Sequence, residues 1–327
     1  MRLYLDQKDW IALARVRLQK ARPADLRAAA ALAEGFDTGR LIVPFSESRV
    51  LETGKRQQPA KWLDVAMTLM LLTKRHALAP LHSLWVQEAD AFLARRFGAS
   101  VDGVPEPFGK GLAFALGIRE DELTLPWAAD ASEAEIAMVA MYAIAEPVRS
   151  GLSAYDHERR ARWDAWAKAV ASTSRELVKD RQKYNEQDRL AMQTLTLLGN
   201  EMIGRAIAHG VQDGYLAVLR DEGPWAVVRE MPSLAVLTEL FRLSYRDTTR
   251  RWTANDYHDT RFLSTALAYC DAVCPDRHWG RLALQSEHIA SCGVIITTGQ
   301  DAVPQAIEGL LRDLGRSGDA AATASQT

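Results

Sequence analysis

Arg2-Leu3-Tyr4-Leu5-Asp6 lies near the start of the 327-residue chain and has the pattern of a short buried strand that ends in a carboxylate. A second segment of this kind lies far downstream, where Ala272-Val273-Cys274 is followed by Pro275-Asp276. Helical periodicity follows the first segment over residues 9–19 and precedes the second over residues 256–268. Both ends of the chain therefore predict strand-plus-helix units of a parallel sheet.

The remaining segments extend this alternation and bound the domain. Leu41-Ile42-Val43-Pro44 is wholly apolar, as buried parallel strands are, and 294–298 predicts a final strand before a helix at 304–314. Residues 61–245 are almost entirely helical in their periodicity. We therefore predict a three-layer α/β/α parallel-sheet domain of the α/β class. Its halves are residues 1–58 and 249–314, a large all-α insertion occupies 59–248, and a disordered tail covers 315–327.

Composition excludes few classes of function. The 40 Lys and Arg residues nearly balance the 42 Asp and Glu residues, so the chain has no overall basic field. Three cysteines without CxxC spacing predict a reducing compartment rather than a disulfide or zinc framework. Charged residues interrupt any signal-peptide core at the N-terminus, and no apolar run is long enough to span a bilayer. We expect a soluble, cytoplasmic protein with no membrane partner.

Acidic residues gather at the ends of the predicted strands and on the helices beside them. Asp6 and Asp276 follow strands and Asp271 precedes one, whereas Asp256 and Asp259 lie three apart on one helix and Glu52 lies on a helix after the second strand. Parallel sheets bind ligands beyond the carboxyl ends of their strands, so the fold predicts several carboxylates in one cleft. Carboxylates at that density repel one another unless a cation joins them, and Mg²⁺ prefers oxygen ligands. The pattern indicates metal-assisted chemistry on phosphate.

Taken singly, each acid also has a structural interpretation. Asp6 would cap the helix over residues 9–19, and Asp256 and Asp259 would be a cap or surface acids. Glu47 competes with Glu52 for any role on its helix, and Asp271 precedes its strand, which would displace it from the cleft. The ordered set, rather than any one acid, favours a metal site.

The ordered set resembles PIN-like domains, the fold of many metal-dependent ribonucleases. The matching segments are LYLDQKDW with Asp6, VPFSESRVLET with Ser46 and Glu52, and NDYHDTRFLSTALAYCDAVCPD with Asp259 and Asp276. The resemblance implies catalytic carboxylates at Asp6, Glu52, Asp259 and Asp276, which would bind Mg²⁺ or Mn²⁺. Asp256 is an acid beyond the family pattern that could join the ligand set. It implies an endoribonuclease, as a toxin or defence effector, with RNA as partner and a protein inhibitor or a second copy as further partners.

Basic residues provide the candidates for substrate contact. Arg246, Arg250 and Arg251 lead directly into the acid cluster, and Ser46 lies close to it in the predicted fold. A basic helix over residues 159–183 carries Trp163 and Trp166, which could stack bases. The acids within that helix favour a solvated surface with the tryptophans packed inward.

Two other classes of function stay open. The chain could be a catalytically inactive PIN-like module that binds RNA or protein, or a metal-dependent enzyme that acts on DNA or on a small phosphorylated molecule. No Walker A, GxGxxG, HExxH or GxSxG motif occurs at a useful position, which argues against nucleotide-driven motors, NAD enzymes, zincins and α/β-hydrolases.

Overall fold

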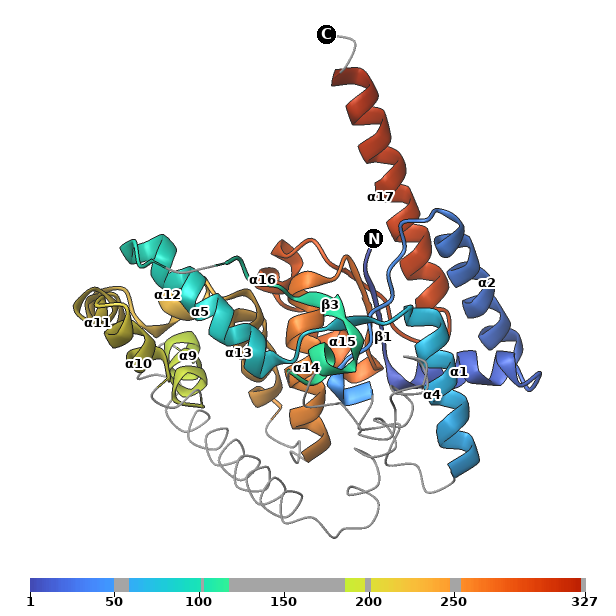
Figure 1. The fold of residues 1–327 in the computed structure, drawn as a ribbon, viewed down its shortest axis with the longest axis horizontal. Coiled ribbons are helices and arrows are strands. Elements are labelled where there is room, and N and C mark those ends of the chain that lie inside the picture. The colour runs from blue at the N-terminus through green and yellow to red at the C-terminus, as the bar shows by residue number, and fades with distance from the viewer. Residues whose placement is uncertain (50–58, 101–102, 118–185, 198–200, 248–253, 325–327) are drawn as a thin grey trace, which may run out of the picture.

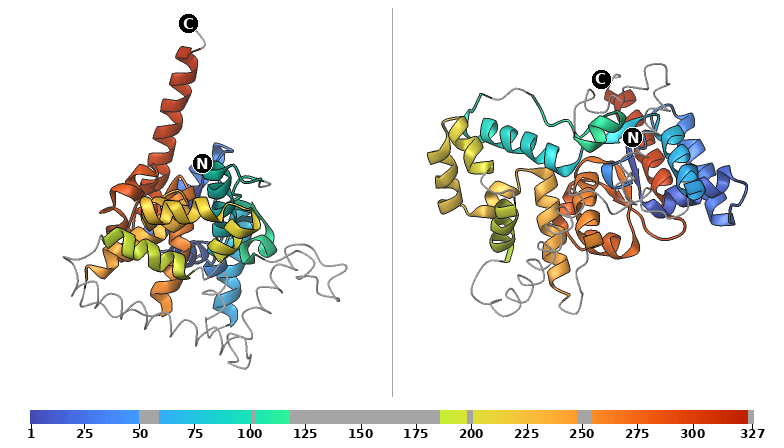
Figure 2. Two further views of the ribbon diagram at one scale, coloured as in Figure 1. Left: turned by 90° about the vertical axis from the view of Figure 1, so that its left-hand side faces the viewer. Right: turned by 60° about the horizontal axis from the view of Figure 1, so that its bottom comes forward.

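The computed structural model describes residues 1–49, 59–100, 103–117, 186–197, 201–247 and 254–324. These residues form a mixed α/β fold in which helices cover a small parallel sheet (Figure 1). A second group of helices lies beside the sheet, on the side away from the N-terminal helices (Figure 2). No helix of the described chain is both long enough and apolar enough to cross a lipid bilayer.

The parallel sheet joins the two ends of the chain. Its strands are β1 (Leu3–Leu5), β4 (Ala272–Cys274) and β5 (Ile295–Ile296), in the order β1-β4-β5. Leu5 pairs with Cys274, so β1 and β4 end at the same level. The strands are three residues long or shorter, and β1 and β4 are buried throughout because helices cover both faces.

Residues 41–45 extend the sheet at the free side of β1. Ile42 bridges to Arg2, and Phe45 bridges to Ala77, both in the parallel sense. Ala77 belongs to β2 (His76–Leu78), which pairs antiparallel with β3 (Phe108–Lys110). The predicted strand at 41–44 is therefore not a regular strand in the structure. It is a connection with one isolated bridge to Arg2, next to β1, and one to Ala77 of β2. β2 and β3 lie in the stretch whose periodicity predicted helices almost throughout.

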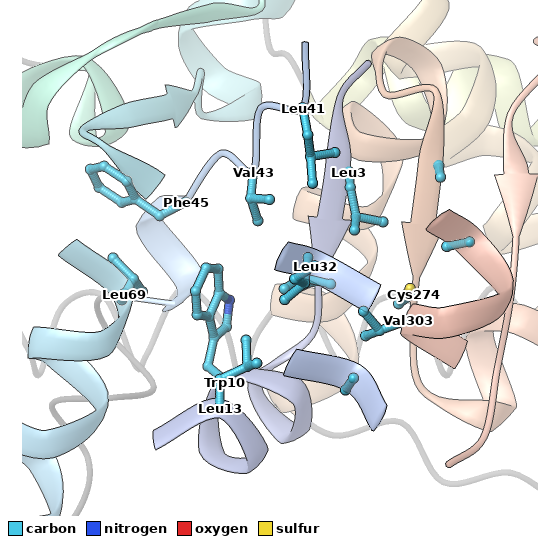
Figure 3. Close-up of a cluster of buried hydrophobic side chains, with 14 of the residues drawn as sticks. Leu3, Trp10, Leu13, Leu32, Leu41, Val43, Phe45, Leu69, Cys274 and Val303 are labelled. Atoms are coloured by element: carbon cyan, nitrogen blue, oxygen red, sulfur yellow. The ribbon is translucent and has the colours of Figure 1, made fainter. Parts of the chain in front are cut away.

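One face of the sheet packs against the N-terminal helices and the last helix. These helices are α1 (Gln7–Arg17), α2 (Pro23–Asp37), α4 (Pro59–Thr73) and α17 (Ala302–Ala324). Leu3 and Leu5 of β1 point into this layer, where they join Trp10 of α1 and Val303 of α17 (Figure 3). α17 starts two residues before the predicted helix and continues to Ala324, through part of the predicted disordered tail.

The opposite face packs against helices from the second half of the chain. They are α13 (Pro232–Tyr245), α14 (Ala254–Tyr269), α15 (Arg277–Ala283) and α16 (Glu287–Ser291). Tyr4 alternates with Leu3 and Leu5 and therefore points into this second layer, beside Val273 and Leu240. The sheet thus has buried apolar layers on both faces.

The helices beside the sheet enclose a third apolar cluster, which α13 shares. They are α5 (Leu81–Phe97), α9 (Glu186–Leu197), α10 (Glu201–Ala208), α11 (Gln212–Asp221) and α12 (Pro224–Val228), and the short α6 (Gly111–Leu116) follows β3. We call α5 and α9–α12 the helical lobe. Glu88 of α5 joins this lobe to the sheet layer, because its carboxylate accepts hydrogen bonds from Ser233 of α13 and Tyr269 of α14. Residues 59–248 are predicted to be an insertion. This range includes α4, β2 and α13, whose side chains belong to the apolar clusters on the two faces of the sheet.

Candidate acidic site at the carboxyl edge of the sheet

Asp6 and Asp276 follow neighbouring parallel strands. Because Leu5 is in register with Cys274, Asp6 leaves β1 where Pro275-Asp276 leaves β4. Lys8 ties these strand ends together, since its Nζ donates to the Pro275 carbonyl at 2.7 Å. The carboxyl edge of the sheet, where parallel folds bind ligands, thus carries two of the predicted carboxylates.

Asp6 is the N-cap residue of α1 and has a buried cation as partner. Its Oδ1 lies 2.8 Å from the guanidinium of Arg49, and its side chain is 20% exposed while that of Arg49 is 4% exposed. The backbone N–H of Asp6 donates to Asp9 at 3.2 Å, the spacing of a capping box. Asp6 therefore occupies the N-cap position that its structural interpretation assigned to it, and its carboxylate is part of a partly buried ion pair.

Arg49 belongs to a buried polar network that starts on β1. Its Nε donates to the Tyr4 hydroxyl at 3.2 Å. That hydroxyl lies 2.9 Å from Ser46 Oγ, which in turn lies 3.0 Å from Ser48 Oγ. Ser46, Ser48 and Arg49 are all buried. Ser46 is predicted to contact substrate, but in the structure it is buried and its hydroxyl contacts the Tyr4 hydroxyl.

Asp9 is a buried carboxyl next to Asp6. Burial raises the pKa of Asp9 to about 7, and the negative charge of Asp6 adds to this rise. The charges of Lys8 and Arg49 and the hydrogen bond from the Asp6 N–H act in the opposite direction. Near neutral pH, Asp9 is thus partly protonated, which reduces the repulsion between the two acids.

Asp276 is the N-cap of α15. Its Oδ1 accepts a hydrogen bond from the backbone N–H of Trp279 at 2.9 Å, and Trp279 is buried beneath the sheet edge. A carboxylate at this position also interacts favourably with the positive end of the helix. The predicted fourth ligand therefore has a structural role in the absence of any metal.

Asp256 and Asp259 lie in the first turns of α14. α14 leads into β4 and packs on the sheet, so it runs antiparallel to the strand and its N-terminal turns lie toward the carboxyl edge. Asp256 is buried, and Asp259 is half-buried. Among the described residues, no three His, Cys, Asp or Glu side chains converge as a set that would hold a metal ion.

The other predicted residues divide into three groups. Glu52, Arg250 and Arg251 lie outside the described residues, as does the basic helix at 159–183. Arg246 forms an ion pair with Glu186 at 3.1 Å on the rim of the helical lobe. Asp271 lies at the amino edge of the sheet, where it accepts the Arg2 N–H at 2.7 Å, on the opposite edge from Asp6 and Asp276.

Sequence reasoning missed Arg49 and Asp9 as parts of this site. Asp9 had a local signal, because an acid three residues after an N-cap is the spacing of a capping box. Arg49 had none, since its partners Tyr4 and Asp6 lie on another strand unit. Only the pairing of residues 41–45 beside β1 brings them together.

The chemistry of the donor set fits a hard divalent cation. Asp6 and Asp276 offer carboxylate oxygens at adjacent strand ends, and no sulfur or imidazole ligand is required. Arg49 competes with a cation for Asp6, because its guanidinium already contacts Oδ1. The described residues thus supply part of the predicted set.

Comparison of the chain with protein-family models, with curated proteins and with solved structures gives no match.

Proposed function

We propose that this chain is a metal-dependent endoribonuclease with a PIN-like catalytic domain, which cleaves RNA phosphodiesters with a water molecule as nucleophile. One observation carries the proposal: the in-register pairing of Leu5 with Cys274 brings Asp6 and Asp276 to adjacent strand ends. The order of the acids along the chain, strand-Asp, helix-Glu, helix-Asp and strand-Asp, adds the resemblance to PIN-like domains.

The proposal assigns the acids as ligands of Mg²⁺ or Mn²⁺. They are Asp6, Glu52, Asp259 and Asp276, with Asp256 as an additional ligand. Such an ion lowers the pKa of bound water and neutralises charge that develops on the phosphate. The chain's own contribution is to fix the carboxylates: Asp276 accepts the Trp279 N–H, and Asp6 is paired with Arg49, which the Tyr4 hydroxyl holds.

RNA as the substrate rests on the resemblance and on the basic residues near the site. Arg246, Arg250 and Arg251 precede α14, whose first turns carry Asp256 and Asp259. Cations at this position would attract a phosphodiester backbone toward the acids. The resemblance adds three further parts to the proposal: a toxin or defence role, a protein inhibitor as partner, and dimerisation. The composition of the chain adds a cytoplasmic location.

Cleavage of labelled RNA tests this function. The full chain would be incubated with single-stranded RNA and Mn²⁺ or Mg²⁺, and compared with Asp6→Asn and Asp259→Asn. Asp271→Asn is the matched control, because it removes the same charge at the amino edge of the sheet. We expect internal cuts that EDTA abolishes, that both site variants lose and that the control retains.

Substrate panels separate the alternatives. Cleavage of DNA or of small phosphate esters in preference to RNA would favour a different metal-dependent phosphohydrolase. The Asp6–Arg49 ion pair supports the second candidate, an inactive PIN-like module that binds RNA or protein, because an arginine already neutralises this acid. RNA binding without cleavage in either metal would favour that candidate.

A further inference from the structure

Arg49 is a buried cation in direct contact with the candidate site. Its side chain is 4% exposed, and its guanidinium lies 2.8 Å from Asp6 Oδ1. The guanidinium also lies over the ring of Tyr4, 5.7 Å from its centroid. Burying a guanidinium is costly unless it is paired and hydrogen-bonded, and both conditions are met here.

The position of Arg49 does not depend on Asp6 alone. The Tyr4 hydroxyl accepts from Arg49 Nε and is in hydrogen-bond contact with Ser46 Oγ, which in turn contacts Ser48 Oγ. The backbone N–H of Arg49 donates to the Ser46 carbonyl at 3.0 Å, which fixes the helical turn that carries it. The guanidinium is therefore held toward the strand end by groups that a ligand at Asp6 would not displace.

Among the described residues, Arg49 is the cation in contact with the Asp6 carboxylate. Lys8 follows Asp6 by two residues, and its ammonium donates to the Pro275 carbonyl. Asp9 is a second acid nearby, and it accepts the backbone N–H of Asp6 at 3.2 Å. A divalent cation that approaches Asp6 thus meets an existing positive charge a few ångströms away.

We infer that Arg49 is the internal countercation of Asp6: it neutralises this carboxylate in the metal-free protein and weakens the affinity of the site for a divalent cation. The inference rests on the proposed function, because it takes Asp6 as a cation ligand. Arg49 is thus a positioning residue that acts through Asp6 and also sets the threshold for metal binding.

Calorimetric titration of the full chain with Mn²⁺ alone tests the inference. Removing a like charge a few ångströms from a bound cation should tighten Mn²⁺ binding about tenfold in Arg49→Met. Arg49→Lys keeps the charge and should bind as weakly as the wild type. Arg205→Met is the matched control, since it removes the same charge from an Arg–Asp pair with Asp90 in the helical lobe and should leave the affinity unchanged.

Further variants keep the test decisive. If Arg49→Met does not fold, Arg49→Gln removes the charge and keeps a donor for the Tyr4 hydroxyl. Adding Asp6→Asn to the Arg49→Met chain should abolish the gain in affinity. A Mn²⁺-dependent rise in melting temperature, larger in Arg49→Met than in the wild type, is the second readout.

The outcomes distinguish the inference from the proposed function. Equal Mn²⁺ affinity in wild type and Arg49→Met, or weaker binding in the variant, overturns the role of Arg49 but leaves a metal site in place. Binding in Arg49→Met with none in the wild type supports that role and contradicts a metal-dependent enzyme. No Mn²⁺ binding by any variant overturns both.

Discussion

Replacing Asp9 with Asn should change how the stability of this protein depends on pH. The carboxyl is buried beside Asp6, and burial raises its pKa from the ordinary value of 3.8 to about 7. Asp6 adds to the rise, while Lys8, the Asp6 N–H and Arg49 oppose it. The folded state therefore prefers Asp9 protonated, and the unfolded state ionises it at lower pH.

The sign and size follow from this difference. A group whose pKa is higher in the folded state contributes stability that is fully present below its unfolded pKa and is lost as pH rises through its folded pKa. For Asp9 the window runs from 3.8 to about 7, and the whole difference corresponds to about 4 kcal/mol. Asn is neutral throughout and keeps a carbonyl oxygen that can accept the Asp6 N–H.

Urea unfolding from pH 4 to pH 8, followed by tryptophan fluorescence, measures the effect. The free energy of unfolding of Asp9→Asn relative to the wild type should rise by about 4 kcal/mol across this range. Asp301→Asn is the control, because it removes an exposed carboxylate whose pair with Arg27 is screened by solvent. A difference between Asp9→Asn and wild type that stays constant with pH would refute the argument.

Two further substitutions test the packing that positions the site. Glu88→Ala should lower the free energy of unfolding by roughly 3 kcal/mol or more. The substitution leaves the backbone N–H and hydroxyl of Ser233 and the Tyr269 hydroxyl without their acceptor, whereas Glu88→Gln should cost less. Equal losses for the two variants in urea unfolding would contradict this. Leu5→Ala should cost roughly 3 kcal/mol by opening a cavity in the fully buried layer of Figure 3, and a loss below about 1 kcal/mol would show that the layer is loosely packed.

The sequence was sufficient to place the two strands that define the carboxyl edge. Leu3–Leu5 and Ala272–Cys274 are observed with the predicted bounds, because an acid or a proline ends each apolar run sharply. Helices α1, α14 and α17 also begin within a few residues of their predicted positions. Local signals such as caps and prolines fix such boundaries, whereas strand register depends on contacts between the ends of the chain.

The strands β2 and β3 could not be predicted from pattern. Each is three residues long, and His76-Ala77-Leu78 shows neither alternation nor a long apolar run. Phe45, which lies well before β2 in the sequence, bridges to Ala77, so contacts from outside the local window position this strand. Hydrophobic periodicity is measured over a window of ten or more residues, so around a three-residue strand it reflects the neighbouring helices rather than the strand.

The acids illustrate how far order along the chain predicts a site. Strand direction separates Asp6 and Asp276, which follow their strands, from Asp271, which precedes one. That separation needs only the sequence and the rule for parallel sheets. The contacts of Asp6 need the tertiary structure, because Arg49 reaches it from a different unit.

The presence of Arg49 is the strongest argument that this edge does more than cap helices. Asp276 caps α15 with its carboxylate and Asp6 occupies the N-cap position of α1, a structural role in which a carboxylate is common. A cap needs no buried arginine, and a buried ion pair is often no more stable than apolar residues of similar volume. Arg49 is nevertheless held against Asp6 by Tyr4, so this acid already has a cationic partner in the protein. If Asp6 is a cation ligand as proposed, Arg49 competes with the metal ion, and the difference in Mn²⁺ affinity between the wild type and Arg49→Met measures that competition.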